Sequence, residues 1–273
     1  MESMITKFPP IRSFVAGVFL FLLLGALARQ AAADLYVADS ETNAVYRYTP
    51  DGVQHTFVSI PQPVALAFDP ANNLFVASYY PSAIYKIRPN GRKSIFLQGG
   101  DAALGLACDS EGSLFVSNGA LDPGITEFKR DGSTRNYVSF YGIGGIAIAS
   151  AGYFYATDIN NNNILKIAVG GTFRELTDGF GYPGRLALDS ADRLYALDDY
   201  NGLVYKIAAT GSKTLFAAVP HPTSLVFDHS GYLFVATSYN LEGSIVAIAP
   251  DGTTSTFATG LRVPSDLAVP NSL

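Results

Sequence analysis

Residues 35–52 read LYVADSETNAVYRYTPDG, which is two apolar runs separated by a polar loop and closed by an Asp-Gly turn. The first run returns as LFVAS from Leu74, LFVSN from Leu114, FYATD from Phe154, LYALD from Leu194 and LFVAT from Leu233. Successive copies start 39 or 40 residues apart. A period near 40 residues with four strands in each unit is typical of the blades of a β-propeller.

Each unit contains four short apolar runs, which in the second unit are residues 65–69, 74–78, 83–87 and 92–98. The runs are rich in Val, Ile, Leu, Tyr and Phe, which suit strands, and Gly, Asn and Asp fill the turns between them. The first run is the least polar, so we expect it to be the innermost strand, packed between blades. No segment after residue 33 has a helical period. The sequence predicts an all-β, six-bladed β-propeller of four-stranded antiparallel blades over residues 34–273.

The last copy of the innermost run stands near the C-terminus, where residues 263–270 read VPSDLAVP. No such copy precedes Leu35, so the first unit lacks an inner strand of its own. The count balances if the C-terminal copy becomes the inner strand of the blade that begins at Leu35. A ring closed in this way by the two ends of the chain leaves no exposed sheet edge.

Residues 1–33 have the features of an export signal. Lys7 and Arg12 give a basic start, residues 13–28 form an uncharged and mostly apolar run, and alanines at 26, 28, 31 and 33 give the A-x-A cleavage pattern. The run is shorter than the roughly 20 apolar residues of a membrane span. We expect a cleaved signal peptide and a secreted or periplasmic protein. An uncleaved N-terminal anchor is the alternative, and membrane contact is expected only in that case.

The charge of the chain argues against a nucleic-acid partner. The formal net charge is −5, and it becomes −7 without residues 1–33, which hold Lys7, Arg12, Arg29 and Glu2. An acidic body with scattered Lys and Arg lacks the basic patch that nucleic acid requires. The single cysteine, Cys108, cannot form an intrachain disulfide and lies in an apolar run. We expect a monomer.

The repeat has the form P-x-x-L-A-x-D, then L-Y-V-A-D, a loop with Asn, V-Y-R-Y and an Asp-Gly turn. In this form it resembles the NHL-repeat propellers and the related senescence-marker-protein and gluconolactonase-like propellers, over residues 34–270. The resemblance implies that ligands bind at the mouth of the central channel. The loops that enter the innermost strands and the loops that leave the second strands share that face.

The resemblance also implies where a metal ion would lie. Gluconolactonase-like enzymes hold a divalent cation at the channel mouth with Glu, Asn and Asp, and the Asn and Asp ligands lie one residue after the Pro of the repeat. The equivalent residues here are Val64, Leu104, Gly144, Gly184, Thr223 and Ser265. None offers the oxygen ligands that such a hard cation prefers in these enzymes, a carboxylate or an amide. We therefore expect no metal and no cofactor, with a calcium ion in the channel as the alternative.

One position further along the repeat, some side chains are charged and could take part in catalysis or binding. Arg185 and Asp266 occupy this position two blades apart, and His221 and Ser224 belong to the blade between them. Histidine could act as acid or base, arginine could hold an anion and aspartate could orient either. Arg185, His221 and Asp266 are the candidate catalytic residues. The alternative is structural: an Arg–Asp pair that bridges inner strands, with His221 merely preceding a turn Pro.

Tyrosines and acidic residues supply the candidate ligand contacts. Six tyrosines fall in or beside the channel-face loops: Tyr79, Tyr80, Tyr141, Tyr182, Tyr200 and Tyr239. Tyrosine offers rigid contact area with a polar tip, so this rim suits a small polar molecule, a glycan or a peptide. The candidate ligand-binding residues are Ser224, Tyr79, Tyr182, Asp198, Tyr200 and Tyr239. Asp39, Asp158 and Asp198 end second runs, where Asp can instead bond the loop backbone.

Two functions are consistent with these residues. The first is an exported, non-catalytic module that binds a ligand or a protein through the channel face. The second is a divergent gluconolactonase-like enzyme, a lactonase- or esterase-like hydrolase or a lyase, with its site at the channel mouth. The missing metal-ligand positions favour the first function.

Overall fold

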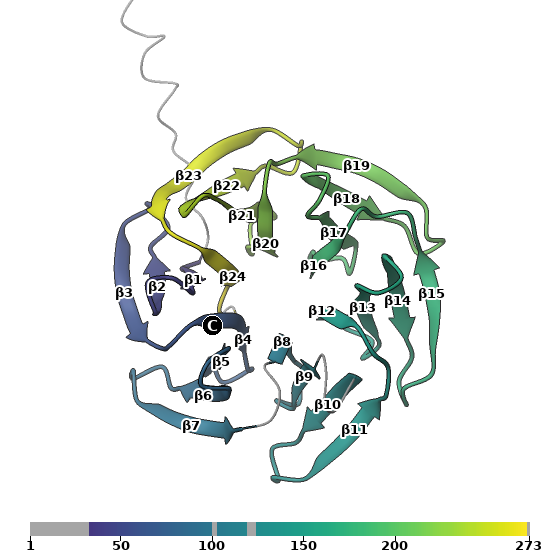
Figure 1. The fold of residues 1–273 in the computed structure, drawn as a ribbon, viewed down its shortest axis with the longest axis horizontal. Coiled ribbons are helices and arrows are strands. Elements are labelled where there is room, and N and C mark those ends of the chain that lie inside the picture. The colour runs from purple at the N-terminus through teal and green to yellow at the C-terminus, as the bar shows by residue number, and fades with distance from the viewer. Residues whose placement is uncertain (1–32, 100–102, 119–123, 272–273) are drawn as a thin grey trace, which may run out of the picture. The chain divides into compact units, whose positions relative to one another are not determined.

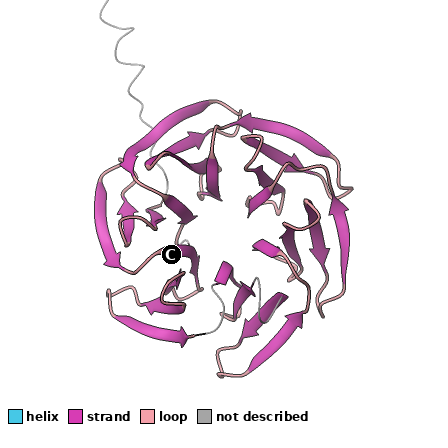
Figure 2. Ribbon diagram, in the orientation of Figure 1, coloured by secondary structure: helices cyan, strands magenta, loops and turns pink. Residues whose placement is uncertain are grey.

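The computed structural model describes residues 33–99, 103–118 and 124–271. Within these residues, 24 strands form six four-stranded antiparallel sheets arranged in a ring (Figure 1). The elements of this part of the chain are strands and loops (Figure 2). None of its segments forms a helix of the length and apolarity that a membrane span requires. The predicted six-bladed propeller is confirmed. The predicted export signal lies outside the described residues, apart from Ala33.

The blades follow one another along the chain, each with its inner strand first except for the first blade. Blade 1 consists of β1 (Leu35–Asp39), β2 (Ala44–Tyr48), β3 (Gln54–Ser59) and β24 (Pro264–Ala268). Blade 2 consists of β4 (Pro63–Phe68), β5 (Leu74–Ser78), β6 (Ala83–Ile87) and β7 (Lys93–Gln98). Blade 3 consists of β8 (Ala103–Cys108), β9 (Leu114–Asn118), β10 (Gly124–Phe128) and β11 (Thr134–Val138).

The second half of the ring repeats this arrangement. Blade 4 consists of β12 (Ile143–Ile148), β13 (Phe154–Asp158), β14 (Asn163–Ile167) and β15 (Phe173–Thr177). Blade 5 consists of β16 (Pro183–Leu188), β17 (Leu194–Asp198), β18 (Leu203–Ile207) and β19 (Lys213–Ala218). Blade 6 consists of β20 (Pro222–Phe227), β21 (Leu233–Tyr239), β22 (Glu242–Ile248) and β23 (Thr254–Leu261).

Burial differs from one strand of a blade to the next. The innermost strands β4, β8, β12, β16, β20 and β24 line the axis of the ring (Figure 1). The most completely buried strands are the second ones, since β1, β5, β13 and β17 are buried at every residue. The innermost strands, expected to be the most enclosed, each keep partly exposed residues. The reason is that one edge of each inner strand faces the channel instead of another strand.

The core between blades is built from aromatic and aliphatic side chains. Tyr36 of blade 1 packs edge-on against Phe68 of blade 2, with ring centroids 5.0 Å apart. Phe115 and Phe154 make the same kind of contact between blades 3 and 4 at 4.7 Å. Such edge-to-face pairs add stability beyond the area that they bury. The repeat thus places large rings where neighbouring blades meet.

The two ends of the described chain meet in blade 1, as predicted. Strand β24 pairs antiparallel with β1, with Tyr36 opposite Ala268 and Val37 opposite Leu267. The carboxylate of Asp39 accepts hydrogen bonds from the backbone N–H groups of Arg262, at 2.7 Å, and Val263, at 3.2 Å. The C-terminal strand therefore closes the ring as the inner strand of the first blade.

Candidate functional site at the channel mouth

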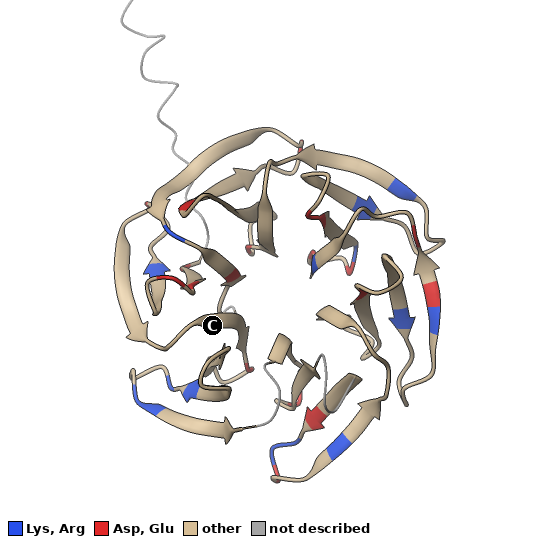
Figure 3. Cartoon of the chain, viewed as in Figure 1, with Lys and Arg blue, Asp and Glu red and all other residues tan. Residues whose placement is uncertain are grey.

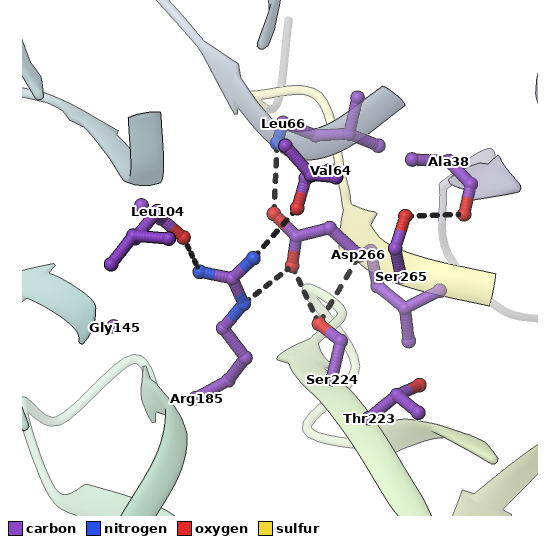
Figure 4. Close-up of polar contacts among 12 residues, drawn as sticks. Ala38, Val64, Leu66, Leu104, Gly145, Arg185, Thr223, Ser224, Ser265 and Asp266 are labelled. Carbon is purple, nitrogen blue, oxygen red and sulfur yellow. Dashed lines mark hydrogen bonds and ion pairs between the residues drawn. The ribbon is translucent and has the colours of Figure 1, made fainter. Parts of the chain in front are cut away.

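The side chain of Arg185 crosses the axis of the ring (Figure 4). It extends from β16 in blade 5, and its Nη2 donates to the carbonyl oxygen of Val64 in blade 2 at 2.7 Å. Its Nη1 donates to the carbonyl oxygen of Leu104 in blade 3. These carbonyls belong to inner strands, which have no partner strand on the channel side. Arg185 therefore satisfies backbone acceptors that would otherwise need water.

Asp266 pairs with Arg185 from the closing strand β24. Its Oδ1 lies 3.6 Å from Arg185 Nε and accepts a hydrogen bond from Ser224 Oγ at 2.7 Å. Its Oδ2 accepts from the backbone N–H of Leu66 at 2.8 Å. Ser224 is fully buried, and its hydroxyl also accepts from the N–H of Leu267 at 3.2 Å. Both oxygens of Asp266 are thus bonded, and Ser224 faces Asp266 rather than a ligand.

His221 does not join this group. It has a positive φ of 50° and an exposed side chain, and its ring stacks on Tyr239 with centroids 4.3 Å apart. Of the four residues predicted to cluster, the structure brings together Arg185, Ser224 and Asp266. The proposed catalytic set of Arg185, His221 and Asp266 shares no cavity among those described here, because His221 lines neither channel cavity.

Arg185 borders two separate cavities along the channel. The upper one lies at the end of the channel where the inner strands begin. We call it the cup, and it has a volume of about 200 Å³. Its walls include Leu104, Ile159, Tyr182, Gly184, Thr223 and Asp199. The lower one has a volume of about 280 Å³ and is bordered by Asp266 and the inner strands. Arg185 therefore borders both cavities, whereas Asp266 borders only the lower one, and the cup is the one at the tyrosine-bearing face.

Asp199 is the residue of the cup that the sequence reasoning missed. It directly follows β17, and its Oδ1 is buried without a hydrogen-bond partner among the described residues. Burial raises the pKa of Asp199 to about 7, although the charge of Arg185 acts in the opposite direction. A carboxyl group that titrates near neutral pH inside a cavity is a candidate functional group. The one available signal was strand alternation, which turns Asp199 away from the side that Asp198 faces.

Gly184 makes the room that Asp199 occupies. A Cβ atom at Gly184 would overlap the carboxylate of Asp199. Gly184 is one of the positions at which the family resemblance implies a metal ligand. Here the position has no side chain, and a carboxylate from the loop after β17 fills the space instead. The described residues contain no group of three or more His, Cys, Asp and Glu arranged to hold a metal ion.

Asp198, its neighbour, has a structural role. It is fully buried, and its carboxylate accepts from the backbone N–H groups of Gly181, at 2.9 Å, and Tyr182, at 3.3 Å, and from Asn201 Nδ2 at 2.9 Å. Burial alone would raise its pKa, but these hydrogen bonds outweigh that effect and hold the pKa below its ordinary value. Asp39 and Asp158 bond loop backbone in the same way. The prediction that Asp198 contacts a ligand is corrected, because its acceptors bond the backbone of the loop before β16 and the side chain of Asn201.

The rim tyrosines are exposed. Tyr79, Tyr182, Tyr200 and Tyr239 are 58%, 44%, 83% and 59% exposed, and Tyr182 borders the cup. Large exposed aromatic side chains on one face suit contact with a ligand. Most Lys and Arg residues lie instead on the outer strands and turns at the periphery (Figure 3).

Comparison with known proteins identifies the fold. No family model and no curated protein matches the chain. Among solved structures, virginiamycin B lyase from Staphylococcus aureus is 18% identical with a TM-score of 0.58, over 71% of this chain and 69% of that one. A gluconolactonase from Xanthomonas campestris is 15% identical with a TM-score of 0.66, over 89% and 84%. A Bacteroides caccae protein of unknown function is 11% identical with a TM-score of 0.70, over 88% and 99%. The chain therefore has the propeller fold that its repeats resemble, and these low identities establish the fold alone.

Proposed function

We propose that the protein binds a small polar molecule, or the polar end of a larger one, in the cup above Arg185. The observation that carries this proposal is the unpartnered oxygen of Asp199. Buried polar atoms are nearly always hydrogen-bonded, and an exception calls for an explanation. A ligand in the cup that donates to the Asp199 carboxyl group would supply the missing partner.

The shape and lining of the cup support this function. Ligand sites are mostly apolar cavities with a few well-placed polar groups. The cup combines Leu104, Ile159 and Pro183 with one unpartnered carboxyl group. Its volume of about 200 Å³ equals roughly six or seven water molecules at about 30 Å³ each. The cup therefore suits a head group, and the exposed tyrosines suit contact with the rest of the ligand. With the export signal that we expect in residues 1–33, the proposed function would be carried out outside the cytoplasm.

A binding screen with a matched pair of variants tests the proposal. The full-length protein would be screened by ligand-observed NMR against small amines, sugars, lactones and carboxylic acids. Asp199→Asn should abolish binding of any hit that occupies the cup. Asp178→Asn is the control, because Asp178 is an exposed residue of the loop before β16 and the substitution removes the same charge. Hits that bind equally to wild type and to the Asp199→Asn variant would place the ligand elsewhere.

The second candidate function is hydrolysis or elimination at the same site. The observation that favours it is the pKa of Asp199 near 7, which suits a group that takes up and releases a proton. Two of the similar structures are a lyase and a gluconolactonase, which is an analogy at the level of the fold. An enzyme of this kind would lose turnover of a lactone or ester in the Asp199→Asn variant and keep it in the Asp178→Asn variant. Saturable binding without turnover would leave the binding function alone.

A further inference from the structure

We infer that the head group bound in the cup is an ammonium group on an alkyl chain, with the carboxylate of Asp199 as its counter-ion. This inference rests on the proposed binding function and adds the chemical class of the ligand. It follows from the charges that face the cup, from the lining of the cup and from the rim around it.

Among the described charged groups in and next to the cup, only Asp199 lacks a partner. Arg185, on β16, is bonded to the carbonyls of Val64 and Leu104 and paired with Asp266. Asp198, on the same strand end as Asp199, accepts hydrogen bonds from the backbone N–H of Gly181, in the loop before β16, and from Asn201 Nδ2. The elements that contribute Leu104, Ile159 and Thr223 bring no charge to the cup. The net uncommitted charge of the cup is therefore the negative charge of Asp199 in its ionised form.

A cationic ligand neutralises the charge of Asp199 better than an anionic or a neutral ligand. A buried carboxylate without a partner is costly, and a counter-ion with hydrogen-bond donors removes the cost. An ammonium group carries three donors and no acceptor, which matches a carboxylate oxygen that lacks a donor. An anion would be repelled by ionised Asp199. A neutral acceptor would need Asp199 in its protonated form.

The walls and the rim fit the remainder of such a ligand. Leu104, Ile159 and Pro183 offer apolar contact to an alkyl chain. Tyr200 directly follows Asp199, is 83% exposed and lies against Gly181, where an added Cβ would come within 3.0 Å of its ring. Tyr182 borders the cup and is 44% exposed. The face of a tyrosine ring attracts cations, so Tyr182, which borders the cup, favours a positive ligand at the entrance.

The pH dependence separates the cationic ligand from a neutral one. Alkylammonium groups, with a pKa near 10.4, stay charged from about pH 6 to pH 8. Asp199, with a pKa of about 7, changes from mostly neutral to mostly ionised over the same range. Binding of an amine should therefore tighten by about tenfold from pH 6 to pH 8 and should release a proton. A neutral hydrogen-bond acceptor should show the opposite trend.

The experiment titrates full-length protein with three probes of similar size, butylamine, butanol and butyrate, by calorimetry at about pH 6 and pH 8. We expect butylamine to bind most tightly, about tenfold more so at the higher pH, and only while Asp199 is present. The Asp178→Asn variant should behave as wild type. N-α-acetyl-lysine amide, a fourth probe, represents a lysine side chain in a peptide. Whether it or the free amine binds more tightly identifies the source of the ammonium group.

Each other outcome is informative. Preference for butanol or butyrate, or tighter amine binding at the lower pH, would overturn the ammonium assignment while leaving the cup as a binding site. If no probe and no compound of the wider screen binds through Asp199, the binding function itself fails. An NMR titration of the Asp199 carboxyl group adds a second readout, since a bound amine should lower its pKa in a protein that is fully folded.

Discussion

At the scale of the residue, two neighbouring aspartates have opposite roles. Asp198 is surrounded by donors, and these hold its pKa below the ordinary value in spite of its burial. Asp199 lacks a donor at Oδ1, and burial raises its pKa to about 7. The difference arises because adjacent residues at a strand end face opposite sides. One carboxylate therefore anchors a loop, and the other is left available in the cup.

The raised pKa of Asp199 predicts a pH-dependent cost to stability. Between its unfolded pKa near 3.8 and its folded pKa near 7, the folded protein holds a proton that the unfolded chain has lost. Stability is therefore lost as pH rises through that window and levels off above it. Asp199→Asn removes this cost, so the variant should be more stable than wild type in urea at about pH 8, with a smaller difference at about pH 5. A difference of the same size at both values, or one shared by Asp178→Asn, would contradict the assignment.

Arg185 predicts a large effect from a single side chain. Replacing it with Met leaves two inner-strand carbonyls without their donor and removes the partner of Asp266. Loss of one member of a largely buried pair should cost about 2 to 4 kcal/mol of unfolding free energy. The control is Arg193→Met, because the Arg193 side chain is 57% exposed in its pair with Asp189, and exposed ion pairs contribute little to stability. Equal losses in the two variants, measured by urea denaturation, would show that Arg185 does not join the blades.

At the scale of the element, β24 is the strand on which ring closure depends. It pairs with β1, and the hydroxyl of Ser265 donates to the carbonyl of Pro63 in blade 2 at 2.6 Å. It also carries Asp266, the partner of Arg185. The five residues of β24 therefore pair with the N-terminal strand and also contribute a side chain at the axis of the ring.

Removal of β24 should destabilise the protein far more than the loss of an ordinary chain end. Deletion of residues 264–273 exposes the edge of β1 and leaves Arg185 without Asp266. We expect a lower melting temperature and a tendency to self-associate. A synthetic peptide of residues 262–271, added in trans, should restore the melting temperature, and a scrambled peptide should not. A truncated protein that melts like the full chain would show that the closure is dispensable.

At the scale of the whole molecule, hydroxyl groups bond successive blades to the backbone of the neighbouring inner strand. Thr223 donates to the carbonyl of Pro264 at 2.5 Å, and Ser117 donates to the carbonyl of Gly144 at 2.7 Å. The two ends of the described chain border one cavity, which includes Asp34 and Asn271. The ring of blades is therefore closed even though the chain has two ends. The place of those ends in the ring depends on how the strands are connected along the chain.

A circular permutant tests this property. Asn271 would be joined to Asp34 by a short Gly/Ser linker, and new ends would be opened in the turn between Asp131 and Gly132. That turn lies between β10 and β11, away from the residues that line the cup. We expect a cooperative melt and the same ligand affinity as wild type, because every blade keeps its four strands. A permutant that folds but no longer binds would show that the cup depends on the original chain ends in blade 1.

The amino-acid sequence by itself determined the propeller and its closure. The 40-residue period, the turn residues and the apolar runs are local features repeated along the chain, so they predict strands and their order without knowledge of contacts. The unmatched inner run at residues 263–270 was sufficient to predict the pairing of β24 with β1. The position of Arg185 in the repeat likewise placed it on an inner strand, two blades from the closing strand.

The tertiary structure alone decided what the channel mouth contains. Arg185 bonds carbonyls that are 81 and 121 residues away in sequence, and His221 turns to the ring of Tyr239. The pKa of Asp199 depends on how much water its neighbours exclude, and its place depends on the missing side chain of Gly184. These are properties of side-chain direction and volume across separate blades. A repeat pattern does not encode them, because equivalent positions in different blades carry different residues.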